Sequence, residues 1–255
     1  MQLTDSQVAQ FDRDGFIRFD RLFSDDEVAL LKSEINRVSG AQSDAIIRER
    51  TGSVRTVYRA HESDGPTASP VFARLARTPR FLRPAQQVLN DEQLYIYHCK
   101  SNIKTAIDGT VWLWHQDYGY WQHDGVPTSQ MATFLVMLDE ATEFSGCLYF
   151  VPGSHKGDVL PAYKDELTTS YPQWAIEKPS MIDLLRKGPR PVAISGGPGT
   201  ASRRLASRAR SSGSAAPSFP RSPPGRRGSA PARPSRPRAP PNGGGPPVQR
   251  RLRRC

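Results

Sequence analysis

Residues 131–138 read MATFLVML, and this run decides the class of fold. Both of its alternating faces are apolar, which is typical of a central strand covered on both sides. Other β-prone or apolar runs, separated by Gly, Pro and Asp, are expected to be strands at Leu94–Cys99, Val111–His115, Gly146–Val151 and Pro191–Ile194. The chain after residue 92 therefore predicts a β-sandwich or barrel.

The chain before residue 92 has a mainly helical pattern. Thr4–Gln7 and Ser24–Glu27 match the capping box, in which a hydroxyl and a Glu or Gln side chain satisfy orphan amides reciprocally. Apolar residues recur at helical spacing after the second box. Gly15–Phe19 reads as a short strand, and residues 71–89 look helical despite two prolines. We expect helices that support the β-rich part.

The formal net charge of +10 is concentrated at the C-terminal end of the sequence. Residues 201–255 hold 14 Arg and no Lys, Asp or Glu, whereas residues 1–200 hold 21 basic and 25 acidic residues, a net charge of −4. A basic nucleic-acid-binding domain within residues 1–200 is therefore not expected, and only the tail could contact phosphates.

The composition divides the chain into residues 1–200, expected to be globular, and a tail, residues 201–255. Ala, Gly, Pro, Arg and Ser make up 48 of the 55 tail residues, which leaves too little apolar surface to offset conformational entropy. We therefore expect a disordered tail. Two further interpretations stay open: an Arg-rich arm for nucleic acid or an acidic partner, and GC-rich DNA translated out of frame.

The three cysteines, Cys99, Cys147 and Cys255, do not form a spaced framework, so free thiols in a reducing compartment are expected. The first residues, MQLTDSQVAQF, lack the basic and apolar regions of a signal peptide. No apolar run approaches the ~20 residues that a membrane span needs. The sequence predicts a soluble, cytoplasmic protein without a membrane partner.

The most aromatic segment, residues 112–121, reads WLWHQDYGYW and holds one His and one Asp. On an extended strand, side chains at i and i+2 point to the same face, so His115 and Asp117 could converge on one ion. An imidazole and a carboxylate suit Fe(II), and one more histidine would complete a facial triad. The spacing alone fits a surface hydrogen-bonding pair equally well.

Two longer runs, HQDYGYWQHDGVP at 115–127 and MATFLVMLDEATEFSGCLYFVPGSHKGD at 131–158, closely resemble the phytanoyl-CoA dioxygenase family of Fe(II)/2-oxoglutarate-dependent oxygenases. FDRDGFIRFDRLFSDDEVALLKSEI at 11–35 is also similar, and the resemblance covers residues 5–200. Within the family, the WH-x-D…W…DG-x-P arrangement is most similar to the ectoine hydroxylase-like branch. The resemblance implies a mainly β fold with supporting helices, a double-stranded β-helix (cupin-like jelly roll).

The same resemblance implies that His115 and Asp117 are iron ligands. Three protein ligands leave positions for bidentate 2-oxoglutarate and for O2. Related halogenases carry a small residue at the position of Asp117, so an acid there favours hydroxylation. The implied activity is a dioxygenase that hydroxylates an unactivated C–H bond of a small molecule.

Four further residues match family positions. Lys104 matches a residue that contacts 2-oxoglutarate, where a cation neutralises the carboxylates, and Asn102 matches a neighbouring polar residue. Trp121 and His98 fall where the ectoine hydroxylase-like branch contacts its substrate. That branch has Gln in place of His98, so ectoine is in doubt as the substrate.

The remaining histidines carry less weight. We expect His155, in PGSHKGD, to fix a turn rather than bind metal. His123 reads as a loop residue with a possible substrate-side role, and His61 as a solvent-exposed loop residue.

The family's second iron histidine is missing from its expected place. It belongs on a late strand after a Gly-rich turn, and an Arg follows about ten residues later. The turn is present as Ser195–Thr200, but no histidine follows His155. The sequence therefore predicts weak iron binding. It leaves open a non-catalytic pseudoenzyme or small-molecule-binding jelly roll, and a nucleic-acid-binding protein acting through its tail.

Overall fold

The computed structural model describes residues 1–105, 109 and 111–205, without the side chains of 203–205. In chain order the elements are α1 (Asp5–Asp14), β1 (Phe16–Phe19), α2 (Asp25–Ser39), β2 (Ile46–Arg48), β3 (Val54–Tyr58), α3 (Pro70–Ala76), α4 (Pro79–Leu89), β4 (Lys100–Asn102), α5 (Asp117–Trp121), η1 (Gln122–Asp124), β5 (Ala132–Val136), β6 (Leu148–Phe150), η2 (Ser154–Lys156), β7 (Ala162–Asp165), β8 (Gln173–Ile176), α6 (Lys178–Lys187), β9 (Val192–Ile194) and β10 (Ala201–Leu205).

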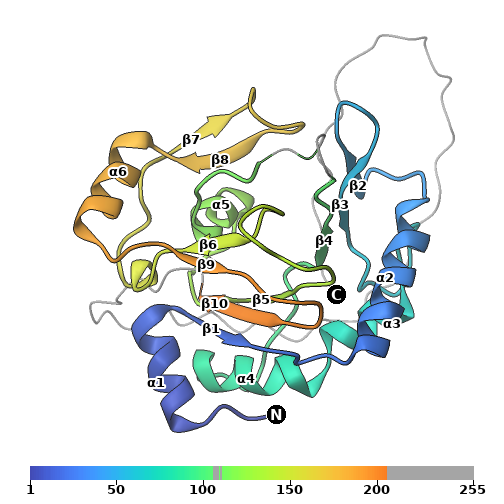
Figure 1. Ribbon diagram of the computed structural model, residues 1–255, viewed down its shortest axis with the longest axis horizontal. Helices are drawn as coiled ribbons and strands as arrows, with labels where there is room; N and C mark the ends of the chain where they lie inside the picture. Colours follow the sequence, from blue (N-terminus) through green and yellow to red (C-terminus); the bar gives the residue numbers. More distant parts are fainter. Residues whose placement is uncertain (106–108, 110, 206–255) are drawn as a thin grey trace, which may run out of the picture. The chain divides into compact units, whose positions relative to one another are not determined.

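The strands form small antiparallel sheets rather than two continuous ones. Within the described residues the strand orders are β1-β10-β5, β2-β3-β4, β6-β9 and β7-β8. Figure 1 shows α1 and α4 along one side of the β1-β10-β5 sheet, and α2 and α3 beside β2-β3-β4. The mainly β architecture with supporting helices is thus present, but the jelly roll is fragmented.

Strand β10 lies at the centre of its sheet and corrects the expected start of the tail. It pairs with β1 and β5, with Ser202 opposite Arg18 and Leu135. Ala201 and Ser202 are each 1% exposed, because small side chains fit a crowded sheet and the ladder uses only backbone groups. Amino-acid composition alone does not reveal such a strand. The rest of the tail, 206–255, lies outside the described residues.

Three expected strands differ from the structure. β5 is not a central strand: within the described chain it pairs only with β10, and all five of its residues are half-buried. The runs Leu94–Cys99 and Val111–His115 form no strand, and β4 begins only at Lys100. These runs are β-prone, but in the described part of the chain no neighbouring strand forms a hydrogen-bond ladder with them. A strand needs such a partner.

The helical half follows the sequence closely. Both capping boxes are formed, and α2 buries Val28, Leu31, Ile35 and Val38. Residues 70–89 form two helices because a new helix starts at Pro79, where the missing amide is tolerated. β1, β6 and β9 lie within their predicted runs. The β2-β3 and β7-β8 hairpins, α5 and α6 were not predicted from the sequence.

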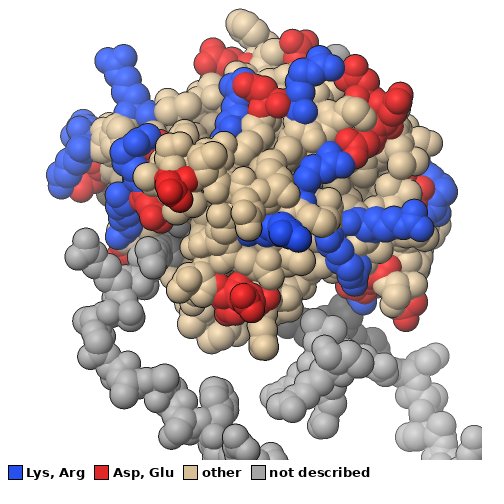
Figure 2. Space-filling model, turned by 90° about the horizontal axis from the view of Figure 1, so that it is seen from below, with Lys and Arg blue, Asp and Glu red and all other residues tan. Residues whose placement is uncertain are grey.

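The surface of the described part carries both signs of charge. Figure 2 shows Lys and Arg interspersed with Asp and Glu on the face seen from below. This agrees with the slightly acidic balance of residues 1–200. Among the described helices, none is both apolar enough and long enough to span a bilayer.

The C-terminal end of α1 packs directly on the PGSHKGD turn. Gly15 caps α1 with φ +82°, and a Cβ there would lie 2.2 Å from His155 Nδ1. His155 Nε2 lies 3.2 Å from the Asp12 carbonyl, and the Gly153 amide donates to the Asp14 carbonyl at 2.8 Å. His155 is therefore a turn-fixing residue, as the sequence predicted, and Gly15 makes room for its ring.

We predict that Gly15→Ala destabilises the fold more than Gly52→Ala does. Both glycines have positive φ, but nothing lies within 4 Å of a Cβ at Gly52. Gly52→Ala should cost only the backbone strain, about 1 kcal/mol. Gly15→Ala adds the collision with His155, about 1–3 kcal/mol more. Urea denaturation measures both, and equal losses would contradict the close packing.

Candidate functional site

His115 and Asp117 meet in the structure, although not on a strand. Gln116 is the N-cap of α5 and Asp117 is its first residue, so the chain turns into a helix between the two side chains. His115 Nε2 still lies 3.4 Å from Asp117 Oδ1. The expected strand is therefore absent here, but the two side chains still lie close together.

The hydrogen bonds of His115 favour a ligand-competent tautomer. Its Nδ1 lies 2.7 Å from the Leu113 carbonyl oxygen. A carbonyl can only accept, so Nδ1 carries the hydrogen, and in the neutral ring the lone pair is then on Nε2. Nε2 faces Asp117. A backbone partner on the other ring nitrogen is the usual arrangement of a metal-ligating histidine.

Asp117 is buried and held from the opposite side by β5. Its Oδ2 accepts a hydrogen bond from Thr133 Oγ1 at 3.0 Å, and the residue is 8% exposed. This bond turns Oδ1 toward His115. Thr133 was not identified from the sequence, because a threonine within an apolar strand gives no functional signal.

The donor set fits a divalent metal only in part. One imidazole nitrogen and one carboxylate oxygen converge, which suits Fe(II). In the described ranges, no third His, Cys, Asp or Glu joins them to form a group of three. Where the sequence lacks the distal histidine, the described structure offers no substitute.

His98 and Trp121 also come together. Their ring centroids are 5.0 Å apart, edge to face, and Tyr97 contacts both rings. Burial, with a smaller effect from Lys100, lowers the pKa of His98 to about 4, and the charge of Asp117 opposes this shift. His98 is therefore neutral at pH 7, near the carboxylate of the candidate metal pair.

Lys104 and Asn102 make hydrogen bonds to groups outside that pair. Lys104 Nζ donates to the Gly146 carbonyl, and burial of the ammonium lowers its pKa although much of the side chain is exposed. A Cβ at Gly146 would lie 3.3 Å from Nζ, so glycine leaves room for the ammonium. Asn102 is exposed and accepts a hydrogen bond from Thr56 at 3.2 Å.

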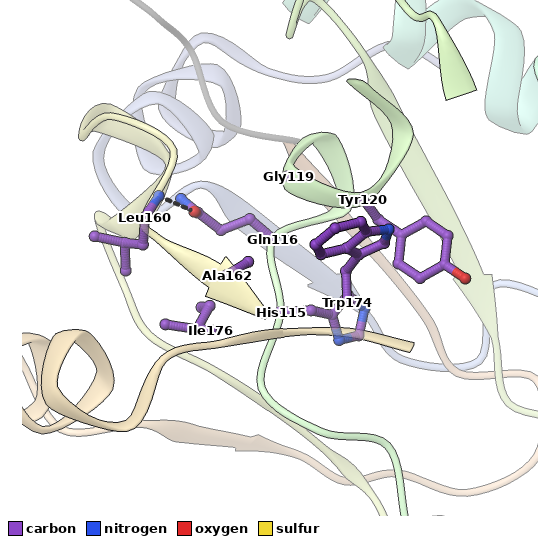
Figure 3. A pocket seen from close by; sticks show the side chains of 8 residues that line it. All are labelled: His115, Gln116, Gly119, Tyr120, Leu160, Ala162, Trp174 and Ile176. Atoms are coloured by element: carbon purple, nitrogen blue, oxygen red, sulfur yellow. Dashed lines mark hydrogen bonds between the residues drawn. The ribbon is translucent and has the colours of Figure 1, made fainter. Parts of the chain in front are cut away.

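Two hollows adjoin the pair. The smaller one is lined by His115, Gln116, Gly119, Tyr120, Leu160, Ala162, Trp174 and Ile176. Figure 3 shows Gln116 reaching across it, where its side-chain oxygen accepts from the Leu160 amide at 2.7 Å. This bond fastens the start of α5 to the loop before β7. A larger cavity, of about 250 Å³, reaches both His115 and Asp117.

A buried ion pair between Glu49 and Arg55 contacts the aromatic segment 112–121. Arg55 donates to Glu49 at 2.9 Å and to the Val111 carbonyl at 3.2 Å, and it is 1% exposed. Its guanidinium lies 4.3 Å from the Trp112 ring centre and 5.2 Å from that of Tyr171. Trp112 thus packs against a charged core group. This pair was not predicted from the sequence because Glu49 and Arg55 lie outside any motif.

The other histidines have structural environments. His61 is buried, not solvent-exposed as expected, because the loop folds inward, and burial lowers its pKa. His123 stacks on Trp174 with ring centroids 3.9 Å apart.

Cys147 is buried and Cys99 half-buried, both as free thiols, and burial raises the pKa of Cys99 to about 11. Cys255 lies outside the described residues.

We predict that His98 titrates near pH 4 and makes folding sensitive to acid. Its folded pKa lies below the ordinary value of 6.5, so the unfolded chain binds the proton first. Stability should fall as the pH drops from about 6.5 to 4, by on the order of 2–3 kcal/mol from this group. NMR of the imidazole and urea denaturation across this window measure both effects. His98→Gln should flatten the curve and His123→Gln should not; titration of His98 near 6.5 would contradict the burial.

The chain matches known proteins over most of its described length. The family model for phytanoyl-CoA dioxygenase matches residues 11–195. An ectoine dioxygenase from Bordetella bronchiseptica is 34% identical over 160 residues, covering 60% of this chain and 50% of the relative. An L-proline trans-4-hydroxylase from Streptomyces griseoviridis is 32% identical over 160 residues, covering 62% and 57%. The chain thus spans about half the length of these curated relatives.

Solved structures agree with the sequence matches. EctD from S. alaskensis with 2-oxoglutarate and 5-hydroxyectoine superposes with a TM-score of 0.67 at 29% identity, covering 80% of this chain and 68% of that one. Another structure of that protein holds bound Fe. The described part of the chain therefore has an EctD-like fold, despite its small sheets. The chain belongs to the phytanoyl-CoA dioxygenase family of Fe(II)/2-oxoglutarate-dependent oxygenases.

Proposed function

We propose that this chain uses His115 and Asp117 as two of three iron ligands in a 2-oxoglutarate-dependent hydroxylation of a small molecule. The observation that carries the proposal is the convergence of His115 Nε2 and Asp117 Oδ1 at 3.4 Å. Family membership supports it, because solved relatives hold Fe and 2-oxoglutarate. We assign this activity to residues 1–200 and place the protein in the cytoplasm, in line with its free thiols.

Each side chain of the pair has one task. His115 presents the Nε2 lone pair because the Leu113 carbonyl holds the hydrogen on Nδ1. Asp117 presents Oδ1 because Thr133 holds Oδ2. Bound iron supplies the oxidation of a C–H bond by O2, with 2-oxoglutarate as the co-substrate. A carboxylate at position 117 would serve as an iron ligand where related halogenases leave room for a halide, which favours hydroxylation.

Lys104 and Asn102 are proposed to bind 2-oxoglutarate. A lysine ammonium is attracted to a dicarboxylate, and Asn102 adds a neutral donor. Lys104 already donates to the Gly146 carbonyl. An ammonium has three donors, so it can keep that bond and still contact a carboxylate.

His98 and Trp121 are proposed to contact the substrate. A neutral imidazole offers both a donor and an acceptor, as the Gln amide of the ectoine hydroxylase-like branch does with its NH2 and carbonyl groups. The lowered pKa of His98 thus lets it stand in for an amide. Trp121 adds an apolar wall. The ligands in the relatives' names, ectoine and L-proline, indicate a small polar substrate for this chain too.

A second candidate function is a non-catalytic binding protein with the same fold. It is favoured by one observation: no histidine follows His155, and the described residues hold no third ligand beside the pair. Such a protein would bind a small molecule, and metal only weakly.

The test is anaerobic Fe(II) titration by calorimetry, together with succinate formation from 2-oxoglutarate. The hydroxylase proposal predicts one Fe(II) per chain, a more than tenfold loss of affinity in His115→Ala and Asp117→Asn, and succinate that depends on both residues. His123→Ala removes an imidazole that stacks on Trp174 and serves as the matched control. Weak Fe(II) binding that depends on His115, without succinate, would select the second candidate. Binding indifferent to both residues would overturn the proposed metal site.

A further inference from the structure

The segment that contains His115 is held in place although it is not part of a sheet. Residues 111–116 lie directly before α5 and belong to no helix or strand. The Trp114 carbonyl accepts a hydrogen bond from β8 at 2.8 Å, and the Val111 carbonyl accepts one from Arg55 at 3.2 Å. Because no described strand forms a ladder with these residues, such single contacts decide how the segment runs.

Arg55 contacts the first two residues of this segment in different ways. Besides donating to the Val111 carbonyl, its guanidinium lies 4.3 Å from the centre of the Trp112 ring and 5.2 Å from that of Tyr171. The two rings meet edge to face with centroids 6.1 Å apart. A guanidinium is planar and has five N–H donors, so it can stack on a ring and donate in its own plane at the same time. It therefore fixes both a backbone carbonyl and a side chain at the start of the segment.

The buried ion pair adds little net stability. Arg55 is 1% and Glu49 6% exposed, and the Nε–H of Arg55 has no hydrogen-bond partner among the described residues. Desolvation of two ions and an unmade hydrogen bond offset most of the attraction, and well-packed apolar residues often replace such pairs without loss. What the pair does restrict is where the groups that it contacts can lie.

The imidazole of His115 is linked to the part of the segment that Arg55 holds. Its Nδ1 lies 2.7 Å from the Leu113 carbonyl, and Leu113 directly follows Trp112. The direction of that carbonyl thus follows from the backbone at Trp112. The bond decides which ring nitrogen has the hydrogen, and so it leaves the lone pair on Nε2.

We propose that Arg55 is a positioning residue for His115, because it holds residues 111 and 112 so that the Leu113 carbonyl meets Nδ1. Glu49 orients the guanidinium: one of its carboxylate oxygens accepts from Arg55 at 2.9 Å, and the other accepts from Ser170. The use of Nε2 as an iron ligand rests on the proposed function. The orientation of the ring does not.

NMR of the imidazole nitrogens in the metal-free chain tests the orientation of the ring. At about pH 8, where an ordinary histidine is neutral, it shows which nitrogen has the hydrogen. His115→Gln identifies the signals. In the wild type the Nδ1–H form should predominate. Arg55→Lys keeps the charge but not the planar set of donors, so the ratio of the Nδ1–H to the Nε2–H form should fall about five- to tenfold, as for one lost hydrogen bond.

A double variant covers the case in which Arg55→Lys does not fold. Glu49→Gln/Arg55→Met leaves no buried charge, and the Gln side chain still offers an acceptor to Ser170. It should fold and show the same fall in the tautomer ratio.

The helical half of the chain provides a matched control. Arg80 pairs with Glu27, donates to the Leu22 carbonyl at 2.8 Å and lies 4.6 Å from the centre of the Phe23 ring. It therefore makes the same three kinds of contact as Arg55, away from the candidate site. Arg80→Lys and Glu27→Gln/Arg80→Met should change stability in urea but leave the tautomer ratio of His115 as in the wild type.

Fe(II) affinity is the second readout and separates this inference from the proposed function. Arg55→Lys should bind Fe(II) about tenfold more weakly than the wild type, and Arg80→Lys equally tightly. If the wild type binds no Fe(II), the proposed function fails while the tautomer ratio still tests Arg55. Three results would overturn the role of Arg55: a wild-type ring without the Nδ1–H form, an unchanged ratio in the folded Arg55 variants, or an equal fall in the Arg80 variants.

Discussion

The hydrogen-bond ladder between β5 and β10 is the constraint on which the candidate site depends. β10 lies between β1 and β5 and pairs Arg204 with Thr133. Thr133 in turn donates to Oδ2 of Asp117, whose other oxygen faces His115. The backbone pairing of β10 with β5 thus positions the threonine that sets the direction of a carboxylate. Ala201 packs with Phe23, Val28 and Phe81, so the same strand is anchored in the core.

The sequence predicted most of the helices and the identity of the paired residues, but less of the sheet. Capping and periodicity are local signals, so α1 and α2 could be predicted closely. Strands depend on partners that are distant in the sequence. Residues 94–99 are β-prone but pair with no strand in the described part of the chain, whereas β10 forms from a segment whose composition predicted a disordered tail. His115 and Asp117 come together through a helix start rather than a strand. Thr133 and the Glu49–Arg55 pair belong to no motif and could only be found in three dimensions.

Charge divides the surroundings of the pair. Lys104 provides a cation suited to a dicarboxylate, His98 is held neutral by burial, and the larger cavity has acidic and aromatic walls. Within the described residues, only His115 and Asp117 converge as possible metal ligands, and no third protein ligand joins them.

We propose that β5 orients Asp117 for metal binding through the Thr133 hydroxyl. The most direct test is the anaerobic Fe(II) dissociation constant of Thr133→Val, which keeps the shape but removes the hydroxyl, compared with Thr133→Ser, which keeps the hydroxyl. If the hydroxyl orients Asp117, Fe(II) should bind roughly 10- to 100-fold more weakly to Thr133→Val and nearly as tightly as wild type to Thr133→Ser. Wild-type affinity in Thr133→Val, in a chain whose Fe(II) binding is lost in Asp117→Asn, would contradict it.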